Sequence, residues 1–254
     1  VCALRHHRRG GGRRRAPRGR LNRTPRMARD LMLFDLDGTL VETAPEIADA
    51  VNDTLHDFGW PAVDEAQVAR WIGHGTGVLL VQALARASGR TPEAVRADAR
   101  HPAIVARYDR HYAERCGTRS RLYPRVRETL AALRTRGTKL AIVTNKETRY
   151  TARVLDAHRL GAAFDRVVCG DTLATRKPDP SGVHDCLRAF ATPPSRALFV
   201  GDSSIDAETA RRAGIAVWLL PYGYNLGEPV AACAPDRLIA DFGALLQDDP
   251  EETT

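Results

Sequence analysis

The sequence predicts an α/β protein with a Rossmann-like, doubly wound parallel sheet and an all-helical segment inserted after the first strand. Short apolar runs, each as long as a buried strand, alternate with helical patterns along most of the chain. This alternation is typical of a parallel sheet with helices on both faces. After the first strand, however, residues 44–116 have a helical pattern throughout, which is far more than one crossover helix requires.

The first apolar run begins at Leu31 and ends in Asp35-Leu-Asp37-Gly-Thr. A helix over about 45–58 follows, and Thr43 and Glu46 have the spacing of a capping box at its start. Further helices of the inserted segment are predicted at 64–71, 78–87, 92–100 and 103–115. Beyond it, the pattern predicts helices 126–136, 147–158, 181–190 and one ending at 213, with strands 139–145, 166–170, 197–202, 215–220 and 237–239.

These elements define the expected domains. Residues 30–43 and 117–246 form the core domain, and residues 44–116 form a helical cap domain. Open α/β sheets place their ligands at the carboxyl ends of the strands, and the insertion leaves from that end of the first strand. The cap would therefore stand over the two aspartates as a lid that excludes water.

The two ends of the chain have unusual compositions. Residues 1–29 form an Arg-rich tail that we expect to be disordered, and residues 247–254 form an acidic tail. The arginine-rich stretch could be a nucleic-acid-binding arm, a transit segment or the product of a mis-assigned start upstream of Met27, and we favour the last. Without the ten arginines of residues 1–26, the 38 basic residues fall to 28 against 31 acidic ones, so the net charge changes from +7 to −3. Nucleic acid is therefore not an expected partner.

Other classes of protein are disfavoured by composition. The five cysteines contain no C-x-x-C pair, so a zinc or disulfide framework is not expected and a reducing compartment fits. No stretch approaches the roughly 18 apolar residues of a membrane span. We therefore expect a cytoplasmic protein without a membrane partner, present as a monomer or a homodimer.

The pair Asp35 and Asp37 is the first candidate for chemistry. Two carboxylates this close repel each other unless a cation or a shared proton relieves them. A hard divalent cation such as Mg²⁺ takes oxygen ligands and often binds a substrate phosphate as well. One aspartate could then act as a nucleophile and the other as an acid and base. The alternative is a strand end that closes in an Asx turn, with Gly38 supplying the sharp bend.

Polar residues also follow the other strands. Thr144 and Asn145 end the strand 139–145, Lys177 precedes a helix, and Asp202 and Asp206 flank the turn after the strand 197–202. Each alone could be a helix cap or a surface charge. Their joint placement at strand ends, in this order, instead favours one site. The chain holds only three lysines among its 38 basic residues, which draws attention to Lys177, a compact charge able to neutralise a carboxylate and a phosphate together.

A glycine-rich loop lies within the inserted segment. Gly73-His74-Gly75-Thr-Gly directly precedes a predicted helix. The amino terminus of a helix after such a loop can bind an anion, although many such loops are plain connectors.

Four stretches resemble, in order, the motifs of the haloacid dehalogenase-like (HAD) superfamily: Asp35-Leu-Asp37-Gly-Thr, Val143-Thr144-Asn145, Lys177-Pro178 and Gly201-Asp202-Ser-Ser-Ile-Asp206. The resemblance covers residues 30 to about 246, and the inserted segment resembles the small helical C1 cap of that superfamily. Three further stretches resemble the phosphoglycolate phosphatase family: the one that starts at Val41, the one around the glycine loop, and Tyr222–Pro229.

The resemblance implies a Mg²⁺-dependent phosphate monoester hydrolase that converts 2-phosphoglycolate to glycolate and phosphate. It implies that Asp35 attacks phosphorus to form an aspartyl-phosphate, and that Asp37 protonates the leaving oxygen and then activates water. Thr144 and Asn145 would hold the phosphoryl oxygens, and Lys177 would offset their charge.

The remaining implied roles concern the metal and the substrate. Mg²⁺ would be held by Asp35, the backbone carbonyl of Asp37 and Asp202, with Asp206 ordering the outer shell. Gly38, Asn145, Gly73, His74 and Gly75 would bind the substrate.

Related activities differ in their residues. A haloacid dehalogenase would lack the second acid, whereas Asp37 is present, and a phosphonoacetaldehyde hydrolase needs a cap lysine, which residues 44–116 lack. A β-phosphoglucomutase-like sugar phosphate mutase keeps both aspartates and remains an alternative. A non-catalytic HAD-fold binding protein, with the Arg tail as its working part, is a second alternative.

Overall fold

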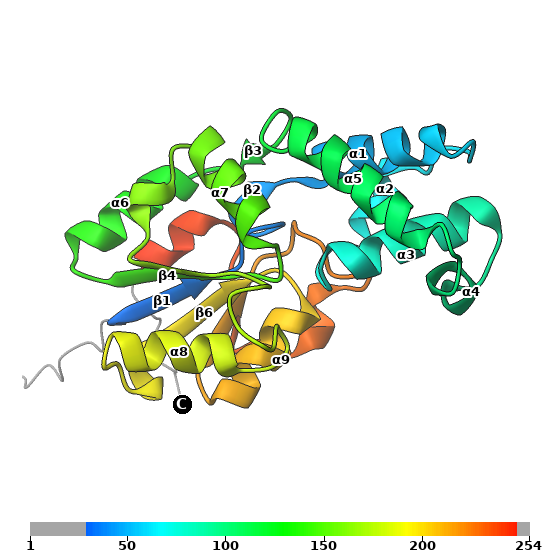
Figure 1. The fold of residues 1–254 in the computed structure, drawn as a ribbon. Helices are drawn as coiled ribbons and strands as arrows, with labels where there is room; N and C mark the ends of the chain where they lie inside the picture. Colours follow the sequence, from blue (N-terminus) through cyan, green and yellow to red (C-terminus); the bar gives the residue numbers. More distant parts are fainter. Residues whose placement is uncertain (1–28, 248–254) are drawn as a thin grey trace, which may run out of the picture.

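The protein is described by a computed structural model that covers residues 29–247. A six-stranded parallel sheet with the strand order β5-β4-β1-β6-β7-β8 lies at its centre (Figure 1). Its strands are β1 (Leu31–Phe34), β4 (Lys139–Val143), β5 (Arg166–Val168), β6 (Ala197–Gly201), β7 (Ala216–Leu219) and β8 (Arg237–Leu238). The prediction of a parallel sheet is confirmed. The predictions for residues 1–28 and 248–254 fall outside the described residues.

Alternate residues of the strands face two different helical layers. On one face, Met32 and Phe34 belong to a core shared with α6 (Val126–Thr135), α7 (Thr148–Ala157) and the short helix η4 (Phe242–Leu246). On the other face, Leu31 and Leu33 pack with α8 (Ser181–Ala189) and α9 (Ser204–Ala213). Figure 1 shows these layers above and below the sheet. Strands buried on both faces explain why the sequence has continuous apolar runs there.

Five helices lie between β1 and α6 in the sequence. They are α1 (Ala44–Asp57), α2 (Glu65–Ala69), α3 (Thr76–Ser88), α4 (Pro92–Arg96) and α5 (His101–Arg115). In Figure 1 they form a group beside the carboxyl ends of the strands. Helix α1 packs along α5 and also contacts α2 and α3, so the inserted segment has its own internal packing. Its buried side chains nevertheless continue into the cluster that covers one face of the sheet.

The inserted helices are joined to the core by two short strands that the sequence analysis did not predict. Strand β2 (Val41–Glu42) pairs antiparallel with β3 (Arg121–Leu122). The predicted capping box at the start of α1 is wrong, because the side chains of Thr43 and Glu46 are used elsewhere. The Thr43 hydroxyl donates to Asp37, and the buried carboxylate of Glu46 accepts from backbone N–H groups of residues 117, 119 and 120. The two side chains thus bond to other partners instead of to the start of α1.

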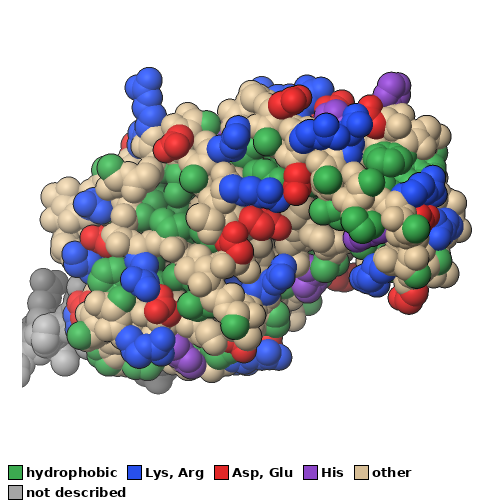
Figure 2. Space-filling model, in the orientation of Figure 1, with side chains coloured by type: hydrophobic (Ala, Val, Ile, Leu, Met, Phe, Trp, Pro, Cys, Tyr) green, Lys and Arg blue, Asp and Glu red, His purple; other side chains and the backbone are tan. Residues whose placement is uncertain are grey.

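The surface of the described residues carries mixed charges. On the face drawn in Figure 2, positive and negative side chains are interspersed over both the core and the inserted helices. Many of them form exposed pairs, such as Arg149 with Asp109 and Arg115 with Asp53. Among residues 29–247, no helix is long and apolar enough to cross a membrane.

Replacement of Phe242 by alanine should destabilise the fold by about 3–5 kcal/mol. The Phe242 ring is fully buried and stacks on Phe34 of the central strand, with 5.6 Å between ring centroids. The measurement is the free energy of unfolding from urea titration of the wild type and the variant. Leu238→Ala, at a side chain that is 46% exposed, is the matched control and should change stability by less than about 0.5 kcal/mol. Equal effects of the two changes would contradict this account of the core.

Candidate active site

The candidate site lies at the carboxyl ends of the central strands. Strand β1 lies between β4 and β6; the chain goes from β1 to β4 on one side and from β6 to β7 on the other, so the connections after β1 and β6 leave in opposite directions. Open α/β sheets bind ligands at such a switch point because the loops that follow the strands separate there. The loops after β1, β4 and β6 carry Asp35, Thr144 and Asp202, respectively. The fold therefore brings together residues more than 160 positions apart.

A buried lysine joins two of the aspartates. The ammonium group of Lys177 lies 2.8 Å from Asp35 Oδ1 and 2.8 Å from Asp206 Oδ1, and its side chain is 2% exposed. Asp35 Oδ1 also accepts the N–H of Leu36 at 2.7 Å. No described residue donates a hydrogen bond to Asp35 Oδ2, so this oxygen is left for other chemistry.

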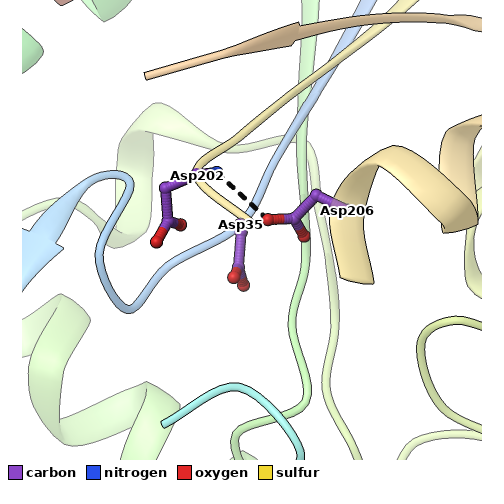
Figure 3. A group of neighbouring side chains, drawn as sticks. All are labelled: Asp35, Asp202 and Asp206. Atoms are coloured by element: carbon purple, nitrogen blue, oxygen red, sulfur yellow. Dashed lines mark hydrogen bonds between the residues drawn. The ribbon is translucent and has the colours of Figure 1, made fainter. Parts of the chain in front are cut away.

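Asp206 fixes the turn between β6 and α9. Its Oδ2 accepts the backbone N–H groups of Asp202 and Ser203, each at 3.1 Å, and the Ser203 hydroxyl at 2.7 Å. The Ser203 hydroxyl in turn accepts the N–H of Asp206, which completes a capping box at the start of α9. Figure 3 shows the bond from Asp202 to Asp206. This network holds Asp202 in a defined position next to Asp35.

Backbone wraps closely around the Asp202 carboxylate. The Thr39 hydroxyl donates to its Oδ1 at 2.6 Å, and the N–H of Tyr224 donates to its Oδ2. A Cβ atom on Gly38 would lie 2.4 Å from Oδ2, and one on Gly223 would lie 2.1 Å from it, so both positions require glycine. Gly38 also has a φ of +86°. Its N–H donates to Val41, so Gly38 shapes the turn and has no free donor for a substrate.

Three carboxylates form a cluster that fits a metal ion. Asp35, Asp202 and Asp206 are buried, and each offers an oxygen within 4.8 Å of the others (Figure 3). Burial raises the pKa of Asp35 to about 6, although Lys177 opposes this shift. Burial and the charges of Asp206 and Asp35 raise the pKa of Asp202 well above its ordinary value, and no cationic side chain among residues 29–247 contacts it.

One ammonium group therefore faces three carboxylates, which leaves a surplus of negative charge in a buried place. All the donor atoms are oxygens. These two properties match a hard divalent cation such as Mg²⁺.

The Asp37 carboxylate lies outside this cluster. Its Oδ1 accepts the Thr43 hydroxyl at 2.7 Å, and both its oxygens contact the ammonium group of Lys146, at 3.1 and 3.2 Å. Asp37 therefore has partners different from those of Asp35, although only Leu36 separates them. The two carboxylates are relieved by two different lysines, which is how the repulsion expected from the sequence is resolved.

The sequence analysis missed Lys146. Its side chain is 4% exposed, and besides Asp37 it contacts the phenol oxygen of Tyr112 at 2.5 Å. Burial is the largest single influence on the pKa of Lys146 and lowers it, but the charge of Asp37, the hydrogen bond with Asp37 and the nearby Cys116 and Glu46 together raise it. A signal was available. Lys146 directly follows Thr144-Asn145, and the rarity of lysine that drew attention to Lys177 applies to it equally.

Thr144 and Asn145 lie beside Asp35 and Asp37. The Thr144 hydroxyl oxygen accepts the N–H of Lys146, and its hydrogen donates to no described group. Asn145 uses its side-chain NH₂ for the carbonyls of Gly73, at 2.8 Å, and Lys177, at 3.0 Å. That side chain therefore ties the inserted helices to the core and has no donor left for a ligand.

A small cavity of about 40 Å³ lies between the sheet and the inserted helices. From the core it is lined by Asp35, Asp37, Thr144, Asn145 and Lys146, and from the inserted segment by Ile47, Ile72, Gly73, Gly75, Thr76, Leu79, Tyr108 and Tyr112. Gly73 and Gly75 thus reach the cavity, and their role in binding a substrate stays a prediction. His74 does not line the cavity. It borders a separate hollow together with Pro178 and Ser204.

Comparisons with known proteins agree with this geometry. The family model described as haloacid dehalogenase-like hydrolase matches residues 32–220. A phosphoglycolate phosphatase of Vibrio cholerae is 39% identical over 220 residues, which cover 85% of this chain and 95% of that protein. A phosphoglycolate phosphatase of Haemophilus influenzae is 40% identical over 216 residues, with 85% and 96% covered.

Solved structures show the same relationship. The crystal structure of a predicted phosphoglycolate phosphatase from Haemophilus somnus superposes with a TM-score of 0.79 at 36% identity, covering 85% of this chain and 96% of that one. The protein CbbY from Rhodobacter sphaeroides, solved in complex with phosphate, superposes with a TM-score of 0.71 at 25% identity. The parallel sheet, the order of the motifs and these relatives together show that the chain belongs to the haloacid dehalogenase-like hydrolase family.

Proposed function

We propose that this protein is a Mg²⁺-dependent phosphate monoester hydrolase whose substrate is 2-phosphoglycolate. The observation that carries the proposal is the pair Asp35 and Asp37 in one small cavity, each neutralised by its own buried lysine. The names of the relatives that are 38–40% identical over most of this chain support the choice of substrate.

Asp35 is the nucleophile in this proposal. Both of its contacts, with Lys177 and with the N–H of Leu36, involve Oδ1, so Oδ2 is available to attack phosphorus. The attack forms an aspartyl-phosphate and breaks the bond between phosphorus and the ester oxygen. Lys177 stays beside the growing negative charge and offsets it, and the Thr144 hydroxyl is positioned to donate to a phosphoryl oxygen.

Asp37 is the acid and base. In the first step it gives a proton to the ester oxygen, so that the leaving group departs as an alcohol. In the second step it takes a proton from the water that attacks the aspartyl-phosphate, which releases phosphate and restores Asp35. The Thr43 hydroxyl and Lys146 orient its carboxylate for both proton transfers.

Asp35 and Asp202 would hold the magnesium ion, together with the backbone carbonyl of Asp37, and Asp206 would order the groups around it. When bound, the ion supplies positive charge next to the phosphoryl oxygens. Without it, the surplus of carboxylates would repel an anionic substrate.

The proposed domain division follows the sequence analysis, with residues 44–116 as a C1-type cap over a core of residues 30–43 and 117–246. Its support is the cavity, whose walls come from both parts, and the contacts between them. The Thr76 hydroxyl donates to Glu147 at 2.8 Å, and Asn145 donates to the carbonyl of Gly73. Such a cap keeps bulk water away from the aspartyl-phosphate.

Asp35→Asn should lower the rate of phosphate release from 2-phosphoglycolate by about 10³-fold or more, because an amide cannot form the covalent intermediate. The measurement is release of inorganic phosphate in the presence of Mg²⁺, beside a panel of sugar phosphates. Asp57→Asn, at a surface aspartate paired with Arg107 on the inserted helices, is the matched control and should keep wild-type turnover. If the wild-type protein interconverts glucose phosphates and releases no phosphate, it is a mutase and the proposed hydrolase function is wrong.

Removal of divalent metal should destabilise the protein more at about pH 7.5 than at about pH 5. The buried Asp35 and Asp202 have pKa values raised above those of unfolded carboxyls, so the metal-free folded state holds protons that the unfolded chain has lost. Its stability therefore falls as the pH rises from about 4 through about 6, the range set by Asp35. A bound cation stabilises the charged carboxylates and restores more free energy at the higher pH.

The measurement is the Tm with Mg²⁺ and with EDTA at both pH values, where each kcal/mol corresponds to about 2–4 °C for a chain of this size. Asp202→Asn should abolish the difference in Tm between Mg²⁺ and EDTA. A Mg²⁺ effect of equal size at the two pH values would contradict the assignment.

A further inference from the structure

The catalytic roles above give Lys146 only the orientation of Asp37, although it also faces the cavity. Its side chain is buried, and it is the one cationic side chain among the described residues that line the cavity. The other buried lysine, Lys177, contacts Asp35 and Asp206 on the phosphoryl side. Lys146 instead contacts Asp37, whose partner in the reaction is the ester oxygen. The two lysines thus mark the two ends of a bound ester.

The ammonium group of Lys146 has a donor to spare. It carries three N–H bonds. Its contacts with the two oxygens of Asp37, at 3.1 and 3.2 Å, have the geometry of one N–H shared between both, and the phenol oxygen of Tyr112 takes a second at 2.5 Å. No other acceptor among residues 29–247 contacts the ammonium group. A third N–H can therefore bind an oxygen of a ligand.

The walls around Lys146 limit the polarity of what it can bind. Ile47, Ile72, Leu79 and Tyr108 line the cavity. These apolar side chains offer few partners for the many hydroxyl groups of a sugar. A leaving group of two carbons fits such walls, and a negative charge on it would meet the one cation there. In low-polarity surroundings a charge-assisted hydrogen bond is stronger than in water.

We propose that Lys146 binds the carboxylate of the leaving group and thereby selects short anionic phosphate esters. This inference rests on the proposed phosphatase function. In 2-phosphoglycolate one methylene group separates the ester oxygen from the carboxylate, so an ammonium group in contact with Asp37 reaches the carboxylate while Asp37 protonates the ester oxygen. Lys146 is therefore a specificity-determining residue, and it should favour binding of the acidic substrate.

The first test uses the wild-type protein with Mg²⁺ and three esters of similar length: 2-phosphoglycolate, ethyl phosphate and phosphoethanolamine. We expect kcat/KM to fall in that order, from the anionic through the neutral to the cationic leaving group. A wild type that hydrolyses all three equally well would overturn the inference but leave the phosphatase function intact. A wild type that releases phosphate from none of them would reject the proposed function itself.

The second test compares Lys146→Met with the wild type. The ratio of kcat/KM for 2-phosphoglycolate over ethyl phosphate should fall roughly 10- to 100-fold, the range for a lost hydrogen bond between charged groups. A ratio that stays unchanged while both rates drop would show that Lys146 only positions Asp37, and would overturn the inference. The ratio compares two substrates on one protein, so it is insensitive to a smaller folded fraction.

Two other cations serve as controls. Lys139→Met removes an exposed lysine that pairs with Asp165 on the surface, and it should leave the ratio unchanged. Arg176→Gln removes an exposed guanidinium group next to the glycine loop, where a Cβ atom on Gly75 would lie 2.8 Å from it. If Arg176→Gln lowers the ratio and Lys146→Met does not, recognition of the carboxylate belongs to the arginine and the inference fails.

Discussion

The ammonium group of Lys177 is the interaction on which the candidate site depends. It bridges Asp35, which follows the central strand, and Asp206, which lies in the first turn of α9. Without this cation, three buried carboxylates would face one another with no counter-charge from the protein. Removing one partner of a buried, hydrogen-bonded pair generally costs about 3–5 kcal/mol. One side chain therefore links the loop after β1, the start of α9 and its own loop before α8 at the edge of the sheet.

The inserted helices complete what the sheet begins. The chain leaves β1 through Asp37 and β2, and it returns through β3, so the acid of the proposed mechanism lies on the path that leads to the helices. The Thr43 hydroxyl at the start of α1 holds Asp37, and the Tyr224 hydroxyl of the core accepts the N–H groups of residues 43 and 44. The helices and the catalytic carboxylates are thus parts of one network of hydrogen bonds.

Much of the fold and part of the site could be predicted from the sequence. The strands of the sheet were found as short apolar runs and the core helices by their local period. The placement of Asp35, Thr144, Lys177 and Asp202 after strands or before a helix follows directly from those patterns. Thr43 is the N-cap of α1 as predicted, but the capping box was predicted wrongly, because its local pattern did not record that the Thr43 hydroxyl donates to Asp37 and that Glu46 accepts from residues 117, 119 and 120.

The sequence by itself determined which residues end strands, because strand length, helical period and glycine positions are properties of neighbouring residues. Only the tertiary structure decided which charge pairs with which. Lys146 and Asp37 are 109 positions apart, and Asn145 and Gly73 are 72 apart, so no local pattern records either contact. The size of the cavity was decided in the same way, because its walls come from two separate parts of the chain. Contacts of this kind form only when the chain packs, since packing is what brings distant side chains within hydrogen-bonding distance.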